Sequence, residues 1–196
     1  PSWPGGGTVR FVSPWNHDYS DNLTEREEAG TPNTIGDIRA ALVFLIKEAV
    51  GEDVIQARDE KFVQMARAGW RDIPQITLLG HPKAHRLPIF SFVVRDAAGN
   101  MVSEQAFTRL LSDIYGIQAR GGCSCAGPYG HRLLEIEQTH SDHLRQEILA
   151  GNDVPKPGWV RLNFSYLMRE DTVQFIIDSV TDLARNFEQV SAKTAT

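Results

Sequence analysis

The chain has 196 residues, enough for one sizeable core. A hydrophobic share of 41% and a charged share of 23% are ordinary for a globular protein and exclude a disordered or fibrous class. A formal net charge of -5 gives no general attraction to phosphate backbones or anionic lipid, so we expect neither nucleic acid nor a membrane as a partner.

Export and membrane signals are weak in this sequence. The longest apolar run, Ala40 to Ile46, is far shorter than the roughly 20 residues of a membrane helix. The opening PSWPGGGTVRF lacks the pattern of a signal peptide and, without a starting Met, looks cut from something longer. Two cysteines, Cys123 and Cys125, cannot build a disulfide framework, so a reducing cytoplasm is expected.

The first third of the chain changes character at Thr34. Residues 1–33 are rich in Pro, Gly, Asn and acidic groups and contain one short β-like run, 8–13, so we expect an irregular segment that packs on another part of the protein. Thr34 is interpreted as the N-cap of a helix that ends at Gly51. The apolar residues with helical spacing are Ile35, Ile38, Leu42, Leu45 and Ala49.

A second helix is predicted over 53–68, with Gly69 at its end. Its expected buried residues are Ile55, Phe62 and Met65. Strands 75–79 and 88–95 follow and are expected to pair across a basic loop. The remaining predicted elements are a helix from Ser103 closed by Gly116, a strand over 117–120, one or two short helices within 131–150, a strand over 159–165, a helix over 170–187 and a frayed tail. Helices and a mostly antiparallel sheet in this order predict a two-layer α+β domain.

The stretch from Arg120 to Ala126 combines a cation, flexible glycines and the thiols of Cys123 and Cys125. A cationic neighbour favours the thiolate, which is the nucleophilic form, so a catalytic loop is one interpretation. A buried structural cysteine pair is equally supported by this stretch alone. Half of a zinc site is less favoured, because C-x-C with scattered histidines differs from the usual C-x2-C spacing. Its further ligands would be His131, His140 or His143.

Arg161 lies in a segment, 159–165, whose apolar and polar residues alternate. The alternation predicts a strand with one apolar face and places the guanidinium on the other. A guanidinium pairs well with a carboxylate, so Arg161 either binds a substrate carboxylate or forms a salt bridge within the protein. The alternation by itself favours the salt bridge.

Thr31 precedes the first strong helix in the run Glu27 to Asn33. A hydroxyl and free backbone N–H groups close to a helix N-terminus bind anions well, so a phosphate is a candidate ligand. Simple helix capping is the alternative, and this segment alone favours it.

Taken in order, four motifs resemble those of class V aminotransferases and their cysteine desulfurase relatives. They are a GGG turn, an E-x-G-T-P-N run before a helix, an R-x-G-x-x-C-A loop and a V-R-x-x-F-S strand before the last helix. The resemblance covers nearly the whole chain and fits least at 127–157, where the link is unusually long. It implies the small C-terminal domain of a fold-type-I transferase that depends on pyridoxal phosphate (PLP), acts on a small amino acid and forms a homodimer.

The resemblance also implies roles for single residues. Thr31 matches the threonine that reaches the cofactor phosphate of the partner subunit. Cys125 matches the persulfide-forming nucleophile of the desulfurase branch. Arg161 matches the arginine that binds the substrate α-carboxylate, and Arg120 matches a loop arginine near it. Cys123 has no assigned role, although Gly-Cys-x-Cys is similar to the spelling in molybdenum cofactor sulfurases. No metal is implied.

One departure is large, because the family's Schiff-base lysine follows a His and no lysine here does. The lysines are Lys47, Lys61, Lys83, Lys156 and Lys193. We therefore expect the chain alone to be inactive, with 1–33 as a remnant of the large cofactor domain, 34–190 as the small domain and 191–196 as a tail. The alternative is a stand-alone binding or assembly module that retains the small-domain fold.

Overall fold

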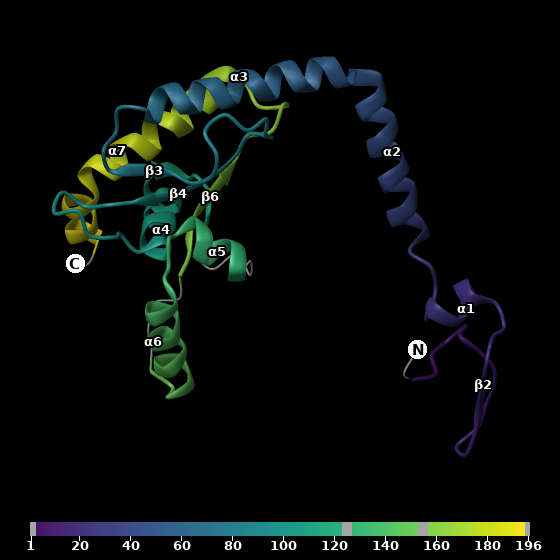
Figure 1. Cartoon of the computed structure of the whole chain (residues 1–196). Helices are drawn as coiled ribbons and strands as arrows, with labels where there is room; N and C mark the ends of the chain where they lie inside the picture. Colours follow the sequence, from purple (N-terminus) through teal and green to yellow (C-terminus); the bar gives the residue numbers. More distant parts are fainter. Residues whose placement is uncertain (1–2, 123–126, 153–156, 195–196) are drawn as a thin grey trace. The chain divides into compact units, whose positions relative to one another are not determined.

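The computed structural model describes residues 3–122, 127–152 and 157–194 (Figure 1). The chain divides into two compact units, residues 1–52 and residues 53–196. This division falls at the first residue of a helix, Glu52, and the predicted domain boundaries stay a prediction.

The first unit begins with a hairpin. Strand β1 (Val9–Val12) pairs antiparallel with β2 (His17–Tyr19), and a short helix, α1 (Leu23–Glu27), follows. Asn22 caps α1 by accepting the backbone N–H of Thr24 at 3.0 Å. The sequence predicted only one β-like run in this region. The second strand and α1 were missed because three-residue and five-residue elements have too few periodic positions to be recognised.

Helix α2 (Thr34–Val50) confirms the predicted helix and corrects its cap. The N-cap is Asn33, whose side-chain oxygen accepts the Gly36 N–H at 3.1 Å, so Thr34 is the first helical residue. No residue of α2 is buried, and Phe44 is 73% exposed. Helical spacing thus identified the apolar residues of this helix but not what covers them.

The second unit contains a four-stranded sheet with the order β3-β4-β6-β5, and every neighbouring pair is antiparallel. Its strands are β3 (Ile76–Leu78), β4 (Ile89–Val94), β5 (Arg120–Gly122) and β6 (Trp159–Asn163). The predicted pairing of the first two strands is confirmed. The strand predicted over 117–120 is wrong in position, because Ile117 lies before β5 and is buried in the core.

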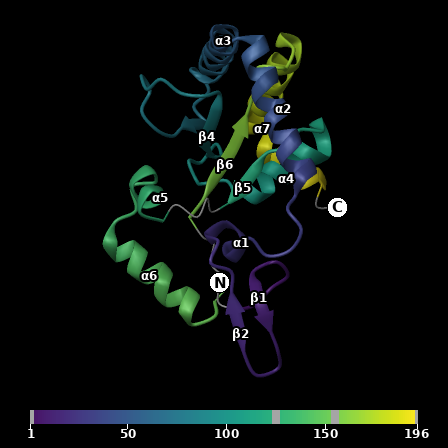
Figure 2. The same ribbon diagram turned by 90° about the vertical axis from the view of Figure 1, so that its right-hand side faces the viewer.

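Helices α3 (Glu52–Trp70), α4 (Glu104–Tyr115) and α7 (Glu170–Thr194) cover one face of this sheet (Figures 1 and 2). The sheet contributes alternate residues to the core, including Phe90 and Phe92 of β4 and Val160 and Leu162 of β6. The predicted α+β class with two layers is confirmed. Among the described helices, none is both long enough and apolar enough to cross a membrane.

Gly69 does not end α3, which runs on to Trp70. A Cβ atom at Gly69 would lie 2.4 Å from Cγ2 of Ile177 on α7. The buried Trp70 Nε1 donates to the Ile177 carbonyl oxygen at 3.3 Å. Gly69 is therefore a close contact between two helices. Of the residues predicted to be buried in α3, Phe62 is buried, whereas Ile55 and Met65 are only half-buried.

The end of α7 also differs from the prediction. The helix continues to Thr194, beyond its predicted end at 187, with non-helical backbone angles at Asn186. Val190 packs against the core as a partly buried residue, and this contact explains the extension. The start of α4 is as predicted, because Ser103 caps it by accepting the Ala106 N–H at 3.3 Å.

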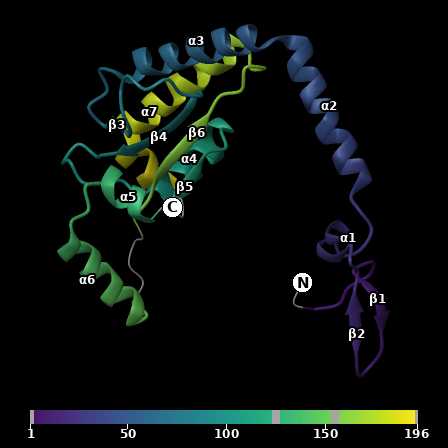
Figure 3. The same ribbon diagram turned by 45° about the vertical axis from the view of Figure 1, so that its right-hand side comes forward.

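Two short helices, α5 (Gly127–Leu133) and α6 (Gln138–Leu149), occupy the link before β6 (Figure 3). Helices in this link were predicted, but α5 begins four residues before the predicted range of 131–150. Gly130 of α5 is buried against Trp159, because a Cβ atom there would lie 3.4 Å from Cζ3 of the indole ring. His131 joins the two helices, with Nδ1 at 2.9 Å from the Gly127 carbonyl oxygen and Nε2 at 2.8 Å from the Ser141 hydroxyl.

Gly121 is the position where strand β5 meets helix α4. A Cβ atom there would lie 2.4 Å from the Glu104 carbonyl oxygen and 2.7 Å from its carbon, both backbone atoms that cannot move aside cheaply. We expect Gly121→Ala to lower the free energy of unfolding by about 1–3 kcal/mol in urea unfolding, as overpacking does. Gly127→Ala is the control, since no heavy atom lies within 4 Å of the added Cβ. Equal stability of the two variants would contradict this packing.

Candidate active site

Arg161 lies in the middle of β6, on the sheet face opposite the helices. Its neighbours Val160 and Leu162 are 1% and 3% exposed and belong to the core. Because successive side chains of a strand point to opposite faces, Arg161 projects outward and is exposed. The predicted orientation is confirmed.

Arg120 is the direct cross-strand partner of Arg161. The register of β5 and β6 pairs Arg120 with Arg161, Gly121 with Val160 and Gly122 with Trp159. Gly121 faces α4, so Arg120 lies on the same outward face as Arg161. The Cβ atoms of directly opposed residues are about 5 Å apart, so the two arginine side chains leave the sheet next to each other.

This pair of cations has no protein counter-ion in the part of the chain that the structure describes. Neither guanidinium forms a hydrogen bond or an ion pair with a described residue. Like charges directly opposite each other destabilise a sheet, and a bound anion between them would remove the repulsion. The salt-bridge interpretation of Arg161 thus finds no partner among the described residues, whereas the geometry suits a carboxylate.

Ser91 extends the row of outward residues. Strand β4 pairs Ser91 with Arg161 across the sheet, so Ser91, Arg161 and Arg120 follow one another over three adjacent strands. The sequence analysis did not single out Ser91. Its alternation with Phe90 and Phe92 gives its face, but its position opposite Arg161 depends on a register that the sequence does not specify.

The predicted nucleophile, Cys125, and its neighbour Cys123 lie outside the described residues. The structure does describe the start of their loop. Gly122 has φ of +116°, a backbone conformation that side-chain-bearing residues rarely adopt, so a glycine is required there. Within the described residues, no group of three or more His, Cys, Asp or Glu is placed to hold a metal ion.

Thr31 lies in the first unit, directly before α2, and is exposed. Asn33 caps the helix, and no described residue forms a hydrogen bond with the Thr31 hydroxyl. An exposed hydroxyl beside a 17-residue helix N-terminus fits a phosphate oxygen. The two arginines belong to the other unit.

A family model described as Aminotransferase class-V matches residues 1–174. The chain belongs to the class V aminotransferase family. Cysteine desulfurases are among its class V relatives in sequence. The chain is 30% identical over 130 residues to a cysteine desulfurase of Pectobacterium carotovorum and 32% identical over 130 residues to one of Salmonella agona. Each alignment covers 65% of this chain and 30% of the relative, so the chain spans under a third of these proteins.

Solved class V structures share the fold. The apo cysteine desulfurase of Thermococcus onnurineus NA1 matches 94% of this chain and 39% of that chain, with a TM-score of 0.64 and 23% identity. The S-sulfonic acid form of the Escherichia coli cysteine desulfurase CsdA matches 93% and 38%, with a TM-score of 0.56 and 22% identity. At these identities the likeness shows the fold alone, which is that of a fold-type-I PLP enzyme.

Proposed function

We propose that this chain is the C-terminal part of a PLP-dependent class V enzyme that removes sulfur from a small amino acid. The names of its relatives favour desulfuration over amino-group transfer. The observation that carries the proposal is the outward pair of Arg120 and Arg161, which has no acidic partner among the described residues. Release of sulfide from cysteine by the full-length protein, in the presence of a thiol that reduces the persulfide, is the direct test.

Arg161 would bind the α-carboxylate of the substrate. A guanidinium forms two parallel hydrogen bonds to a carboxylate, and this geometry fixes the orientation of the amino acid as well as its position. Arg120, on the adjacent strand, adds a second positive charge on the same face. The pair would therefore select amino acids and hold the substrate before the reaction begins.

Cys125 would be the nucleophile. Its thiolate attacks the sulfur atom of the substrate, an S–S bond forms while the C–S bond breaks, and the electron pair of that bond stays on the substrate carbon side. Arg120 lies in β5, five residues before this thiol in the sequence, and a cation close to a thiol favours the thiolate. The product would be a persulfide on Cys125.

PLP supplies the electron sink for this chemistry when it is bound. Thr31 fits its phosphate, because its exposed hydroxyl lies at the start of α2. This chain offers no matching lysine for the covalent bond to PLP, since none of its lysines follows a histidine. Lys47 and Lys61 form ion pairs with Glu52 and Glu170. We propose that the full-length enzyme contains the anchoring lysine. We propose also that it forms a homodimer, in which Thr31 reaches the cofactor phosphate of the partner subunit, and that it is cytoplasmic.

This assignment makes a prediction for the chain alone. We expect that pyridoxal phosphate will not attach to it covalently at one site, because no lysine occupies the family position. Titration should give no saturable, stoichiometric absorption band near the visible edge, and borohydride should fix no label on a single lysine. The full-length protein is the control and should show both. One-to-one labelling of a lysine in the isolated chain would contradict the prediction.

A further inference from the structure

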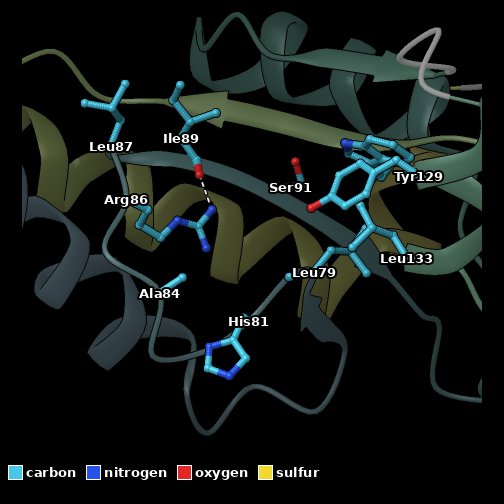
Figure 4. Close-up of a pocket in the computed structure, with 11 residues that line it drawn as sticks. Leu79, His81, Ala84, Arg86, Leu87, Ile89, Ser91, Tyr129 and Leu133 are labelled. Carbon is cyan, nitrogen blue, oxygen red and sulfur yellow. Dashed lines mark hydrogen bonds between the residues drawn. The ribbon is translucent and has the colours of Figure 1, made fainter.

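A pocket of about 370 Å³ lies on the outward side of the sheet, between the loop that joins β3 to β4 and helix α5. Figure 4 shows Arg86 and Tyr129 entering it from opposite sides, with their polar ends pointing toward each other and Ser91 between them. Its volume is within the range of small-molecule sites. The proposed function gives no role to any residue that lines this pocket. One of them, Ser91, lies beside Arg161 in the sheet.

Arg86 places a cation in this pocket without an acid to pair with it. Its guanidinium donates to the Ile89 carbonyl oxygen and lies over the Phe90 ring, 5.3 Å from the centroid. It forms no ion pair with a described carboxylate, and the positive Arg67 is close enough to affect it. Burial, and then Arg67, lower the pKa of Arg86, while Tyr129 acts in the opposite direction. Most of its five N–H donors remain for a ligand.

Trp159 adds an independent observation. It lines the pocket, is 6% exposed and carries an indole N–H that has no acceptor among the described residues. A buried donor without an acceptor costs about 1–3 kcal/mol, and such groups in native proteins call for an explanation. This atom has almost no accessible surface, so an acceptor from the pocket reaches it only when the side chains around the indole ring shift.

The remaining walls of the pocket are mainly apolar. They are formed by Leu79, Ala84, Leu87, Ile89 and Leu133. The pocket thus combines the Arg86 guanidinium, the Tyr129 hydroxyl and the Trp159 indole with aliphatic side chains. This combination suits an anionic group attached to a short aliphatic chain. We propose that this pocket binds a small aliphatic carboxylate, with its carboxylate on Arg86 and Tyr129 and Trp159 as a further donor.

The test uses the full-length protein labelled with 5-fluorotryptophan and 4-methylpentanoate as the probe. Trp159→Phe assigns the fluorine resonance of Trp159, because that resonance is missing from the spectrum of the variant. Titration to about 20 mM would reveal even a millimolar Kd. We expect a saturable shift of the Trp159 resonance, at least tenfold weaker binding after Arg86→Gln, and at least tenfold weaker binding of the uncharged 4-methylpentanamide.

Three variants separate the pocket from the arginine row. Lys83→Gln, an exposed cation in the same loop that does not line the pocket, should leave the Kd unchanged. Ala84→Phe keeps Arg86 but fills the space, and should abolish binding even if Arg86→Gln impairs folding. Arg161→Ala should retain it, whatever happens to sulfide release. No saturable binding, or binding that survives Arg86→Gln and Ala84→Phe but not Arg161→Ala, would overturn the proposal.

Discussion

Replacement of Cys125 by alanine in the full-length enzyme is expected to abolish sulfide release from cysteine. Removal of the thiol removes the group that accepts the substrate sulfur, and the other cysteine of this chain, Cys123, has no assigned role. Loss of a covalent nucleophile removes its whole contribution to the rate, so we expect activity at the background of the assay. Substrate binding should persist, since the α-carboxylate contact belongs to Arg161.

The matched control is Cys123→Ala, two residues earlier in the same loop and without an assigned role. It should retain most of the sulfide release, and both variants should be assayed in parallel for sulfide and for keto acid. If the enzyme transfers amino groups instead, Cys125→Ala should leave keto-acid formation nearly unchanged. That outcome would assign the protein to the aminotransferase branch and remove Cys125 from the mechanism.

The sequence predicted those features of the fold that repeat over many residues. The alternation in 159–165 gave both the strand and the outward face of Arg161, and helical spacing gave α2, α3, α4 and most of α7. Turn chemistry was equally informative at Gly116, which adopts the left-handed conformation expected after α4.

Features that depend on contacts between distant segments could not be predicted in this way. A glycine at position 69 is typical of a helix end, but here it allows close contact with Ile177, more than 100 residues away. The extension of α7 depends on packing of Val190. The site shows the same limit, since Arg120 and Ser91 flank Arg161 through strand register alone. Trp159 was within reach, because it is two residues from Arg161 in the same strand.

Arg161→Ala is expected to weaken binding of the amino-acid substrate by about 2–5 kcal/mol, as for other desolvated charge-paired contacts. Removal of one partner of an ordinary salt bridge lowers the free energy of unfolding, whereas we do not expect Arg161→Ala to lower it. The free protein loses a like-charge contact with Arg120, so its free energy of unfolding should stay the same or rise by up to about 1 kcal/mol. Substrate-analogue titration and urea unfolding measure the two quantities separately.

Asn163→Ala is the matched control, since Asn163 is exposed on the same face of β6, two residues from Arg161. It should change neither quantity by more than about 0.5 kcal/mol. Arg161→Lys should recover part of the binding, because the charge remains while the paired hydrogen bonds are lost. If Arg161→Ala leaves substrate binding intact and lowers stability, Arg161 forms a salt bridge within the protein and the carboxylate site is elsewhere. Weaker binding with unchanged or higher stability requires that the anion neutralising Arg120 and Arg161 comes from outside the chain, and under the proposed function this anion is the substrate.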